Sequence, residues 1–297
     1  MKICTLCPRM CAVDRKSGGR GVCGQTEEIK VARAALHFWE EPCISGENGS
    51  GAVFFSGCAL HCVFCQNENI ANGTAGKAIS TERLGEIFLE LQEKGANNIN
   101  LVTPGQFVPQ IIRAVELARN QNLKIPIVYN TGSYENVDTI RSLEGIVDIY
   151  LPDFKYWNNA LSAKYSHAPD YPSVAKRAIG EMVRQTGAAV FEDGEDSLMK
   201  RGTIVRHLIL PGCTKDSKAV LRYLHETYGD HIYISIMHQF TPLPNVEKYP
   251  ELNRRITKRE YNDVVDFALA IGIENGFIQE GETAKESFIP EFDNEGV

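Results

Sequence analysis

The sequence has no long hydrophobic run and no excess of positive charge. No apolar run among its 297 residues approaches the roughly 18 residues that a helix needs to span a bilayer. The N-terminus also lacks the basic and then apolar order of a secretory signal peptide. Lysine and arginine number 31 against 38 acidic residues, giving a net charge of −7, and the two signs are interspersed, so no basic patch marks a nucleic acid partner. These absences predict a cytoplasmic protein that binds neither membranes nor nucleic acids.

Cysteine, in contrast, is abundant. The chain has nine cysteines, and a reducing cytoplasm keeps them as thiols, so clustered ones are candidate metal ligands. Cys58, Cys62 and Cys65 have C-x3-C-x2-C spacing in a short segment, which lets all three reach one metal centre. Three thiolates suit a 4Fe-4S cluster whose fourth iron stays open for chemistry. The alternatives are a zinc knuckle, which normally closes with four ligands, and three unrelated core thiols.

With Phe64 before the third cysteine, this loop reads C-x3-C-x-aromatic-C and resembles the signature of the radical S-adenosylmethionine superfamily. The resemblance implies that Cys58, Cys62 and Cys65 hold a catalytic 4Fe-4S cluster, with Phe64 beside the cofactor S-adenosyl-L-methionine. In that family the open iron binds the amino and carboxylate groups of S-adenosylmethionine, and one electron breaks the C5′–S bond. The resulting 5′-deoxyadenosyl radical takes a hydrogen atom from the substrate. A reduced flavodoxin or ferredoxin-type electron donor is also implied.

A second group of cysteines lies near the N-terminus, where Cys4, Cys7, Cys11 and Cys23 are set among glycines. Residues 1–24 are too few for a hydrophobic core of their own, so four thiols there indicate a lobe stapled by metal. A tetrahedral zinc site and a closed second iron-sulfur cluster fit equally well. Unliganded thiols that pack as small apolar side chains are the third interpretation.

From residue 51 onward, apolar runs alternate with amphipathic helical patterns, as in repeated βα units around a parallel sheet. The six repeats are fewer than those of a closed barrel and agree with the partial (β/α)6 barrel that the resemblance implies. We therefore predict an α/β fold with a lobe and connector over 1–50, a partial barrel over 51–280 and a polar, mobile tail over 281–297. The predicted strands cover 52–55, 98–102, 125–129, 147–151, 203–210 and 232–236. The predicted helices cover 107–120, 135–143, 172–186, 216–227 and 257–270, after a first helix that Ser80 or Thr81 caps and Gly95 ends.

Polar residues follow the predicted strands, at the edge where α/β folds bind ligands. Thr103 follows the second strand, where the superfamily has a glycine-rich turn that receives the amino group of S-adenosylmethionine. The Thr-Pro-Gly-Gln sequence here departs from the common Gly-Gly-Glu, but its backbone carbonyls can still accept an ammonium; an ordinary βα turn is the alternative. Asn130 follows the third strand, in a turn similar to the Asp-Thr-Asn-Gly turn of glycyl-radical-enzyme activases.

Charged residues follow the fourth strand and lie within the fifth. Asp153 and Lys155 belong to a Leu-Pro-Asp-Phe-Lys segment that resembles the Leu-Asp-Leu-Lys segment of the same activases, which lies near the methionine moiety. A solvated ion pair is the alternative. Arg206 begins an Arg-x-x-x-x-Pro-Gly pattern, and its guanidinium suits the methionine carboxylate. His207 faces the other way and is expected to pack in the core. His238, after the sixth strand, is a candidate cofactor or substrate contact, or else a core histidine.

Nearly the whole chain resembles the pyruvate formate-lyase activating enzyme-like subgroup that carries an N-terminal cysteine-rich lobe. The segments that show it are Cys4 to Arg9, Ser56 to Cys58 and Arg206 to Leu208. The resemblance implies an oxidoreductase that abstracts hydrogen from a protein or peptide, with activation of a glycyl-radical enzyme as one form of that reaction. Two alternatives stay open, a radical enzyme that acts on a small metabolite and a non-enzymatic iron-sulfur electron carrier.

Overall fold

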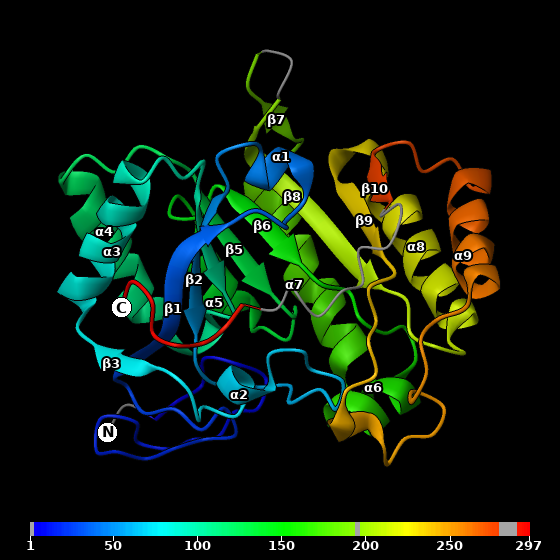
Figure 1. The fold of residues 1–297 in the computed structure, drawn as a ribbon, viewed down its shortest axis with the longest axis horizontal. Coiled ribbons are helices and arrows are strands. Elements are labelled where there is room, and N and C mark those ends of the chain that lie inside the picture. Colours follow the sequence, from blue (N-terminus) through cyan, green and yellow to red (C-terminus); the bar gives the residue numbers. More distant parts are fainter. Residues whose placement is uncertain (1–2, 194–196, 279–289) are drawn as a thin grey trace.

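The computed structural model describes residues 3–193, 197–278 and 290–297. Its centre is a sheet whose parallel strands are flanked by helices (Figure 1). Neighbouring strands follow the order β10-β9-β8-β6-β5-β4-β2-β1-β3, so β10 and β3 are the edges of the described sheet and no pairing closes it into a barrel. The predicted α/β fold with a partial barrel is confirmed. The parallel strands are β2 (Ser50–Phe55), β4 (Ile99–Val102), β5 (Ile127–Thr131), β6 (Ile149–Pro152), β8 (Met199–Leu208), β9 (Tyr233–Met237) and β10 (Gly276–Ile278).

The helices between these strands form the outer layer. Within the described residues, none of them has both the length and the apolar character to cross a bilayer. The longer helices are α3 (Thr81–Glu93), α4 (Val108–Asn120), α6 (Asn159–Ser166), α7 (Tyr171–Thr186), α8 (Thr214–Tyr228) and α9 (Lys258–Ala270). The short ones are α1 (Pro42–Ser45), α2 (Glu68–Ala71) and α5 (Val137–Arg141), with single 3₁₀ turns at Gly105–Phe107, Gly229–His231 and Pro244–Val246.

Helix α3 illustrates how the sequence determines this layer. Its residues Leu84, Ile87, Phe88 and Leu91 are buried in the main core, as their i, i+3, i+4 and i+7 spacing predicts. The hydroxyl of Ser80 accepts a hydrogen bond of 3.1 Å from the backbone N–H of the third helical residue. Ser80 is therefore the N-cap, which satisfies one of the amides that the first turn leaves unpaired.

Strand β1 (Ile29–His37) extends the sheet beyond the predicted barrel. It pairs antiparallel with β2 and with the short β3 (Lys77–Ile79), and a further two-residue strand, β7 (Val190–Phe191), pairs with β8. The sheet thus begins at Ile29 and not after the boundary predicted at residue 50. The sequence pattern for a strand is weak in this segment, because several of its residues are alanine, which is uncommon in strands.

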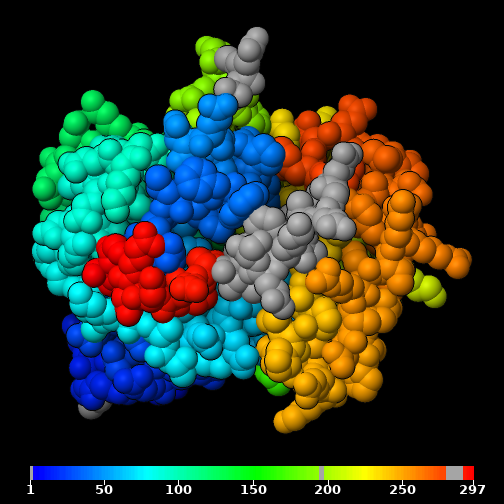
Figure 2. All heavy atoms as spheres, viewed as in Figure 1, coloured from blue at the N-terminus to red at the C-terminus, as the bar shows by residue number. Residues whose placement is uncertain are grey.

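The C-terminal residues pack on β1, although their polarity predicts a mobile tail. The backbone N–H of Ala34 donates a hydrogen bond of 2.8 Å to the carbonyl oxygen of Glu295, and Arg33 forms an ion pair with the Glu295 carboxylate. Figure 2 shows this segment, in red, lying on the surface of the N-terminal half. Residues 290–297 are thus placed against the sheet, whereas 281–289 lie outside the described residues.

Helix α1 fills the barrel at the end where the parallel strands begin. Cys43 and Ile44 are buried there against Ile149 and Leu151 of β6. The side-chain amide of Asn98 donates a hydrogen bond of 2.7 Å to the carbonyl oxygen of Ile44 and fixes the helix in place. Cys43 is thus a buried core thiol, as expected for a cysteine that stands alone in the sequence.

The N-terminal lobe, residues 3–28, contains no helix or strand and lies at the opposite end of the sheet from α1 (Figure 1). The guanidinium of Arg9 links it to the barrel, because Nε donates a hydrogen bond of 2.8 Å to the carbonyl oxygen of Ala59 and Nη1 one of 2.6 Å to that of His167. The same group lies 5.1 Å from the ring centroid of Tyr134. The lobe is therefore fastened to the loops at the carboxyl ends of the strands.

Candidate active site

The loop with Cys58, Cys62 and Cys65 starts directly after the carboxyl end of β2, as predicted. Gly57 stands at its start with a φ of 89°, and a Cβ there would lie 2.6 Å from the carbonyl oxygen of Cys23. Only glycine fits such a position, because its backbone is left-handed and lies against another segment. The lobe backbone thus lies in direct contact with the first turn of the cysteine loop.

The side chain of Gln106 joins this loop to the turn after β4. Its Nε2 donates to the carbonyl oxygens of Ser56, Gly57 and Thr103 at 2.9, 3.0 and 2.9 Å. Thr103 has a φ of 56°, which non-glycine residues seldom adopt, so the turn is held in a specific conformation. The turn predicted to receive the amino group of the cofactor is therefore fixed relative to the cysteine loop.

The three thiols of the loop have polar and electrostatic contacts of their own. The hydroxyl of Ser166 donates a hydrogen bond of 2.9 Å to Cys62 Sγ. Burial raises the pKa of Cys65 to about 12 and also raises the pKa of Cys62, against the opposing effect of Lys155. Thiols that are this difficult to ionise become thiolates when a metal replaces the proton. Three soft sulfur donors beside one cavity fit a 4Fe-4S cluster with an open iron.

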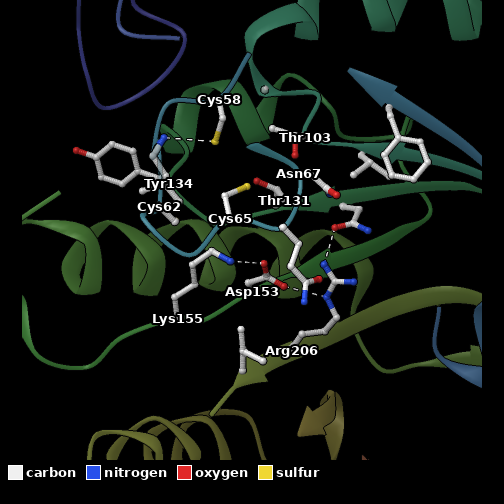
Figure 3. A pocket seen from close by; sticks show the side chains of 18 of the residues that line it. Cys58, Cys62, Cys65, Asn67, Thr103, Thr131, Tyr134, Asp153, Lys155 and Arg206 are labelled. Carbon is white, nitrogen blue, oxygen red and sulfur yellow. Dashed lines mark hydrogen bonds and ion pairs between the residues drawn. The ribbon is translucent and has the colours of Figure 1, made fainter. Parts of the chain in front are cut away.

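One cavity of about 770 Å³ brings most of the predicted site residues together (Figure 3). Its wall includes the cysteine loop, three cysteines of the lobe and the polar residues at four strand ends. The predicted residues that line it are Cys4, Cys7, Cys23, Cys58, Cys62, Phe64, Cys65, Thr103, Asn130, Asp153, Lys155 and Arg206. Of the predicted residues, Cys11 and His238 do not line it.

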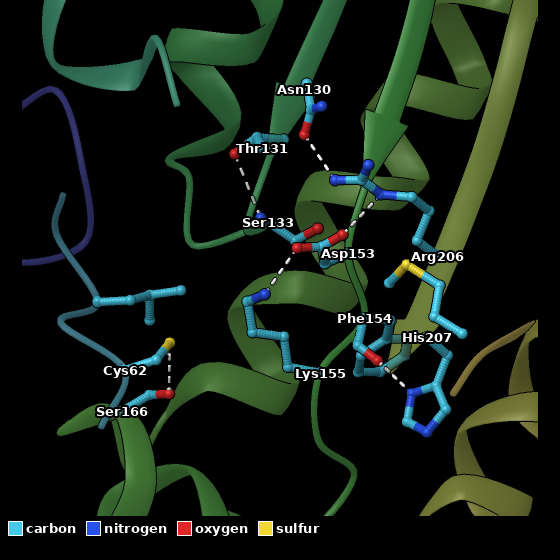
Figure 4. A network of polar contacts seen from close by, with 12 residues as sticks. Cys62, Asn130, Thr131, Ser133, Asp153, Phe154, Lys155, Ser166, Arg206 and His207 are labelled. Carbon is cyan, nitrogen blue, oxygen red and sulfur yellow. Dashed lines mark hydrogen bonds and ion pairs between the residues drawn. The ribbon is translucent and has the colours of Figure 1, made fainter. Parts of the chain in front are cut away.

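A buried network of charged side chains forms one wall of this cavity (Figure 4). Arg206 is at its centre and donates from Nε to Asp153 at 2.9 Å, from Nη1 to Glu40 at 3.0 Å and from Nη2 to the Asn130 side chain at 2.6 Å. The ammonium of Lys155 donates to the other oxygen of Asp153 at 2.6 Å. These side chains are 10–18% exposed, so they are not the solvated surface pair that was the alternative for Asp153 and Lys155.

The effect of neighbours on ionisation agrees with this geometry. Arg206 and Lys155 hold the pKa of Asp153 below its ordinary value although burial opposes them. Asp153 raises the pKa of Lys155 in turn. The pair is therefore ionised, with a buried cation that faces the cavity near the Cys62 thiol.

Three other predicted side chains have packing contacts. The Phe64 ring lies 6.0 Å from that of Phe240 and supports the cysteine loop. His207 is 1% exposed, and its Nδ1 lies 2.7 Å from the carbonyl oxygen of Phe154, so it packs in the core as predicted. The His238 ring lies 4.9 Å from that of Tyr261, while its chain neighbours line the cavity. His238 follows directly after the end of β9, and its side chain does not reach the cavity.

Sequence reasoning missed three acidic residues that line the cavity. Glu40 and Glu41 lie in the segment interpreted as a connector, and Glu135 follows the turn after β5. Glu135 is 6% exposed; its Oε1 accepts a hydrogen bond of 2.7 Å from Thr131, and burial raises its pKa to about 7. The sequence did contain a signal for Glu40 and Glu41, since both follow a run of apolar residues directly before Pro42. Charged side chains in such surroundings rarely lack a partner, so they could have been predicted as buried site residues.

The lobe cysteines lie close enough to influence one another. Burial raises the pKa of Cys7 to about 12, and Glu135, Cys23 and Cys11 add to that rise. Burial also raises the pKa of Cys23, with contributions from Cys4 and Cys11. Within the described part of the chain, no three histidine, cysteine or acidic side chains, those of the lobe and of the signature loop included, converge around a position for a single metal ion. The metal site of the lobe remains a prediction.

Comparison with known proteins gives a family for most of the barrel. The family model described as Radical SAM superfamily matches residues 52–224. The uncharacterized protein MJ0674 of Methanocaldococcus jannaschii is 27% identical over 278 residues, which cover 90% of this chain and 74% of the relative.

Two solved structures illustrate what the chain is similar to. The FeFe-hydrogenase maturase HydG from Carboxydothermus hydrogenoformans is similar with a TM-score of 0.51 and 14% identity, over 78% of this chain and 53% of HydG. SuiB of Streptococcus suis, bound to the precursor peptide SuiA, has a TM-score of 0.49 and 13% identity, over 76% of this chain and 47% of SuiB. The chain spans about half the length of these solved proteins. At this identity, the likeness to HydG concerns the fold alone.

Proposed function

Because the chain belongs to the radical S-adenosylmethionine superfamily, we propose that it cleaves S-adenosylmethionine reductively and abstracts hydrogen from a protein or peptide substrate. One observation carries the proposal: the three cysteines of the signature loop and the buried Lys155–Asp153–Arg206 network line the same cavity. An electron carrier needs no such cavity beside its cluster, so this arrangement favours the enzyme over the carrier.

In this proposal the cluster and S-adenosylmethionine supply the radical when bound, through homolysis of the C5′–S bond by one electron. Cys58, Cys62 and Cys65 hold the cluster. Lys155, oriented by its 2.6 Å contact with Asp153, binds the methionine carboxylate with its remaining hydrogens. A reduced flavodoxin or ferredoxin-type protein is the proposed electron donor.

Other cavity residues have supporting roles in the proposal. Arg206 holds Asp153 in position for its contact with Lys155, and each of the guanidinium nitrogens has a partner. Asn130 holds that guanidinium in position, and the Thr103 turn offers a carbonyl oxygen to the ammonium. Phe64 supports the loop from behind.

The shape of the open sheet supports a polymeric substrate. The described sheet ends at β10 on one side, and the cavity lining includes Gly276, Phe277 and Ile278 of that strand together with residues 38–42 after β1. A cavity bounded by two separate sheet segments can admit an extended chain from the side, whereas a small metabolite suits an enclosed site. Activation of a glycyl-radical enzyme is the form of this reaction that the sequence resemblance favours, and a small-molecule substrate is the alternative.

The lobe cysteines are proposed to bind a second metal centre, either zinc or an iron-sulfur cluster. Cys4, Cys7 and Cys23 line the same cavity as the signature loop, and burial raises the pKa of two of them. A metal that replaced their protons would neutralise the thiolates, which burial otherwise disfavours, and would staple a segment that has no regular secondary structure.

The experiment starts with anaerobic reconstitution of the protein with iron and sulfide. Dithionite and S-adenosylmethionine are then added, and 5′-deoxyadenosine is quantified; its absence would refute the enzyme assignment. Reconstituted protein is next added to anaerobic extract from cells grown on deuterated amino acids. Deuterium in 5′-deoxyadenosine and a glycine-centred doublet in electron paramagnetic resonance would support an activase. Label that comes only from the low-molecular-weight fraction would favour the small-metabolite alternative.

A further inference from the structure

Glu41 is a buried carboxylate that the proposed cofactor chemistry does not use. It is 8% exposed and lines the cavity, and its Oε2 has no hydrogen-bond partner among the described residues. Ser235, in β9, lines the same cavity, and its side chain acts to lower the pKa of Glu41 against the effect of burial. A carboxylate oxygen that is desolvated and unpaired is costly, so a site of this kind is normally completed by a ligand.

The charges around Glu41 do not balance. The ion-paired network contains the carboxylates of Glu40 and Asp153 and the cations of Lys155 and Arg206, so an ionised Glu41 adds a third negative charge to two positive ones. Arg206 is the cation that acts on Glu41, but its nitrogens already donate to other partners. Burial raises the pKa of Glu41, and the neighbouring Glu40 adds to that rise. A further positive group bound in the cavity would compensate the charge of an ionised Glu41.

Three apolar residues line the cavity together with Glu41. Phe38 and Trp39 directly precede the acidic pair, line the cavity and are 49% and 63% exposed, whereas Glu41 itself is buried. Ile278, at the end of β10 and 39% exposed, lines the same cavity. An apolar rim leading to an acid suits a long side chain with an aliphatic stem and a charged end, because the stem packs on the rings while the cation reaches the carboxylate.

We propose that Glu41 and Ser235 form a subsite for the cationic end of a lysine or arginine side chain of the substrate. This inference rests on the proposed peptide-directed function and adds a specificity to it. The substrate would present a basic residue next to the position that loses hydrogen. Cationic S-adenosylmethionine is the competing occupant of this subsite, and the test separates the two.

Two small probes test the subsite: N-acetyl-lysine N-methylamide and the uncharged N-acetyl-norleucine N-methylamide. Their affinities for the reconstituted full-length protein, with S-adenosylmethionine present and no reductant, are measured by saturation-transfer nuclear magnetic resonance. A hydrogen bond between charged partners predicts that the wild type prefers the lysine probe by about tenfold. Glu41→Gln should abolish this preference and Glu41→Asp should retain part of it. Glu47→Gln, which changes an exposed acid of the same segment, should keep all of it.

Each other outcome contradicts the subsite. Equal affinity of the two probes for the wild type, or no measurable binding of either, would overturn it. A loss of S-adenosylmethionine affinity in Glu41→Gln with the lysine preference intact would assign Glu41 to the cofactor instead. Circular dichroism shows whether Glu41→Gln is folded. If it is not, Ser235→Ala is tested in its place, and an unchanged preference of that variant for the lysine probe would contradict the proposal. Production of 5′-deoxyadenosine by the wild type without any probe tests the proposed function separately.

Discussion

Arg206 donates a hydrogen bond of 3.0 Å to Glu40, a residue 166 positions earlier in the chain. Glu40 comes from the segment between β1 and α1, and Arg206 comes from β8 on the other side of the sheet. This contact means that the segment after β1 is part of the barrel interior. The position of the most highly connected cation in the cavity thus depends on a residue outside the βα repeats.

Replacement of Glu40 tests this dependence. We expect Glu40→Ala to lower the free energy of unfolding by about 3 kcal/mol, because it leaves a buried guanidinium with one carboxylate fewer. In an Arg206→Met background the same change should cost at least about 1 kcal/mol less, since the two residues interact directly. Urea denaturation of the four proteins measures the coupling. The exposed Glu47→Ala is the matched control, and additive effects of Glu40 and Arg206 would contradict the prediction.

The cysteine loop should be indispensable for catalysis. Changing Cys58, Cys62 or Cys65 singly to Ala is expected to reduce 5′-deoxyadenosine formation to background, because a cluster with a missing ligand is not held in position. The assay is chromatography of anaerobic reactions with dithionite. Cys213→Ala removes a half-buried thiol outside both cysteine groups and should retain activity. Turnover by a variant that lacks all three loop cysteines would disprove the site.

The lobe should hold metal independently of the loop. The double change Cys4→Ala and Cys7→Ala is expected to remove zinc or iron from the protein while the reduced cluster of the loop keeps its electron paramagnetic resonance signal. Metal analysis by inductively coupled plasma mass spectrometry gives the stoichiometry. Cys43→Ala, in the core beside Ile44, is the control for loss of a buried thiol. An unchanged metal content in the double variant would contradict the second site.

Glu135 predicts a pH dependence of stability in the metal-free protein. Its pKa is raised to about 7 by burial, so the folded state binds the proton more tightly than the unfolded state. Stability is therefore highest below the ordinary carboxyl pKa, falls as the pH rises from there to about 7, and stays constant above that. The loss amounts to at most about 3 kcal/mol. Glu135→Gln keeps the acceptor for Thr131 and should be the more stable protein at pH 8 but not near pH 5. Urea denaturation of both proteins at both pH values gives the free energy of unfolding. The same change of this free energy with pH in the wild type and in Glu135→Gln would contradict the prediction.

The sequence predicted the repeated part of the fold and the residues at most strand ends. Parallel strands with helical crossovers have strong local patterns, such as the buried stripe of α3. The strand-end rule then places Thr103, Asn130, Asp153 and Arg206 on one cavity, because carboxyl ends of parallel strands share an edge.

What the sequence did not predict depends on contacts between distant segments. β1 is rich in alanine and becomes a strand by antiparallel pairing with β2. Glu40 becomes a site residue only when β1 brings it beside Arg206. The case of His238 is different, since Met237 and Gln239 on either side of it line the cavity and His238, just past the end of β9, does not.

The pairing of residues 293–295 with β1 has a consequence for the order of events during protein synthesis. Arg33 and Ala34 leave the ribosome early, but their partners Asp293 and Glu295 emerge more than 250 residues later. Until then, the part of β1 beyond its pairing with β3 has unpaired backbone groups on its outer side, which are a template for association with other chains. Nascent chains that have not reached these partners should therefore be the aggregation-prone species, and residues 293–295 cover a strand that is made long before them.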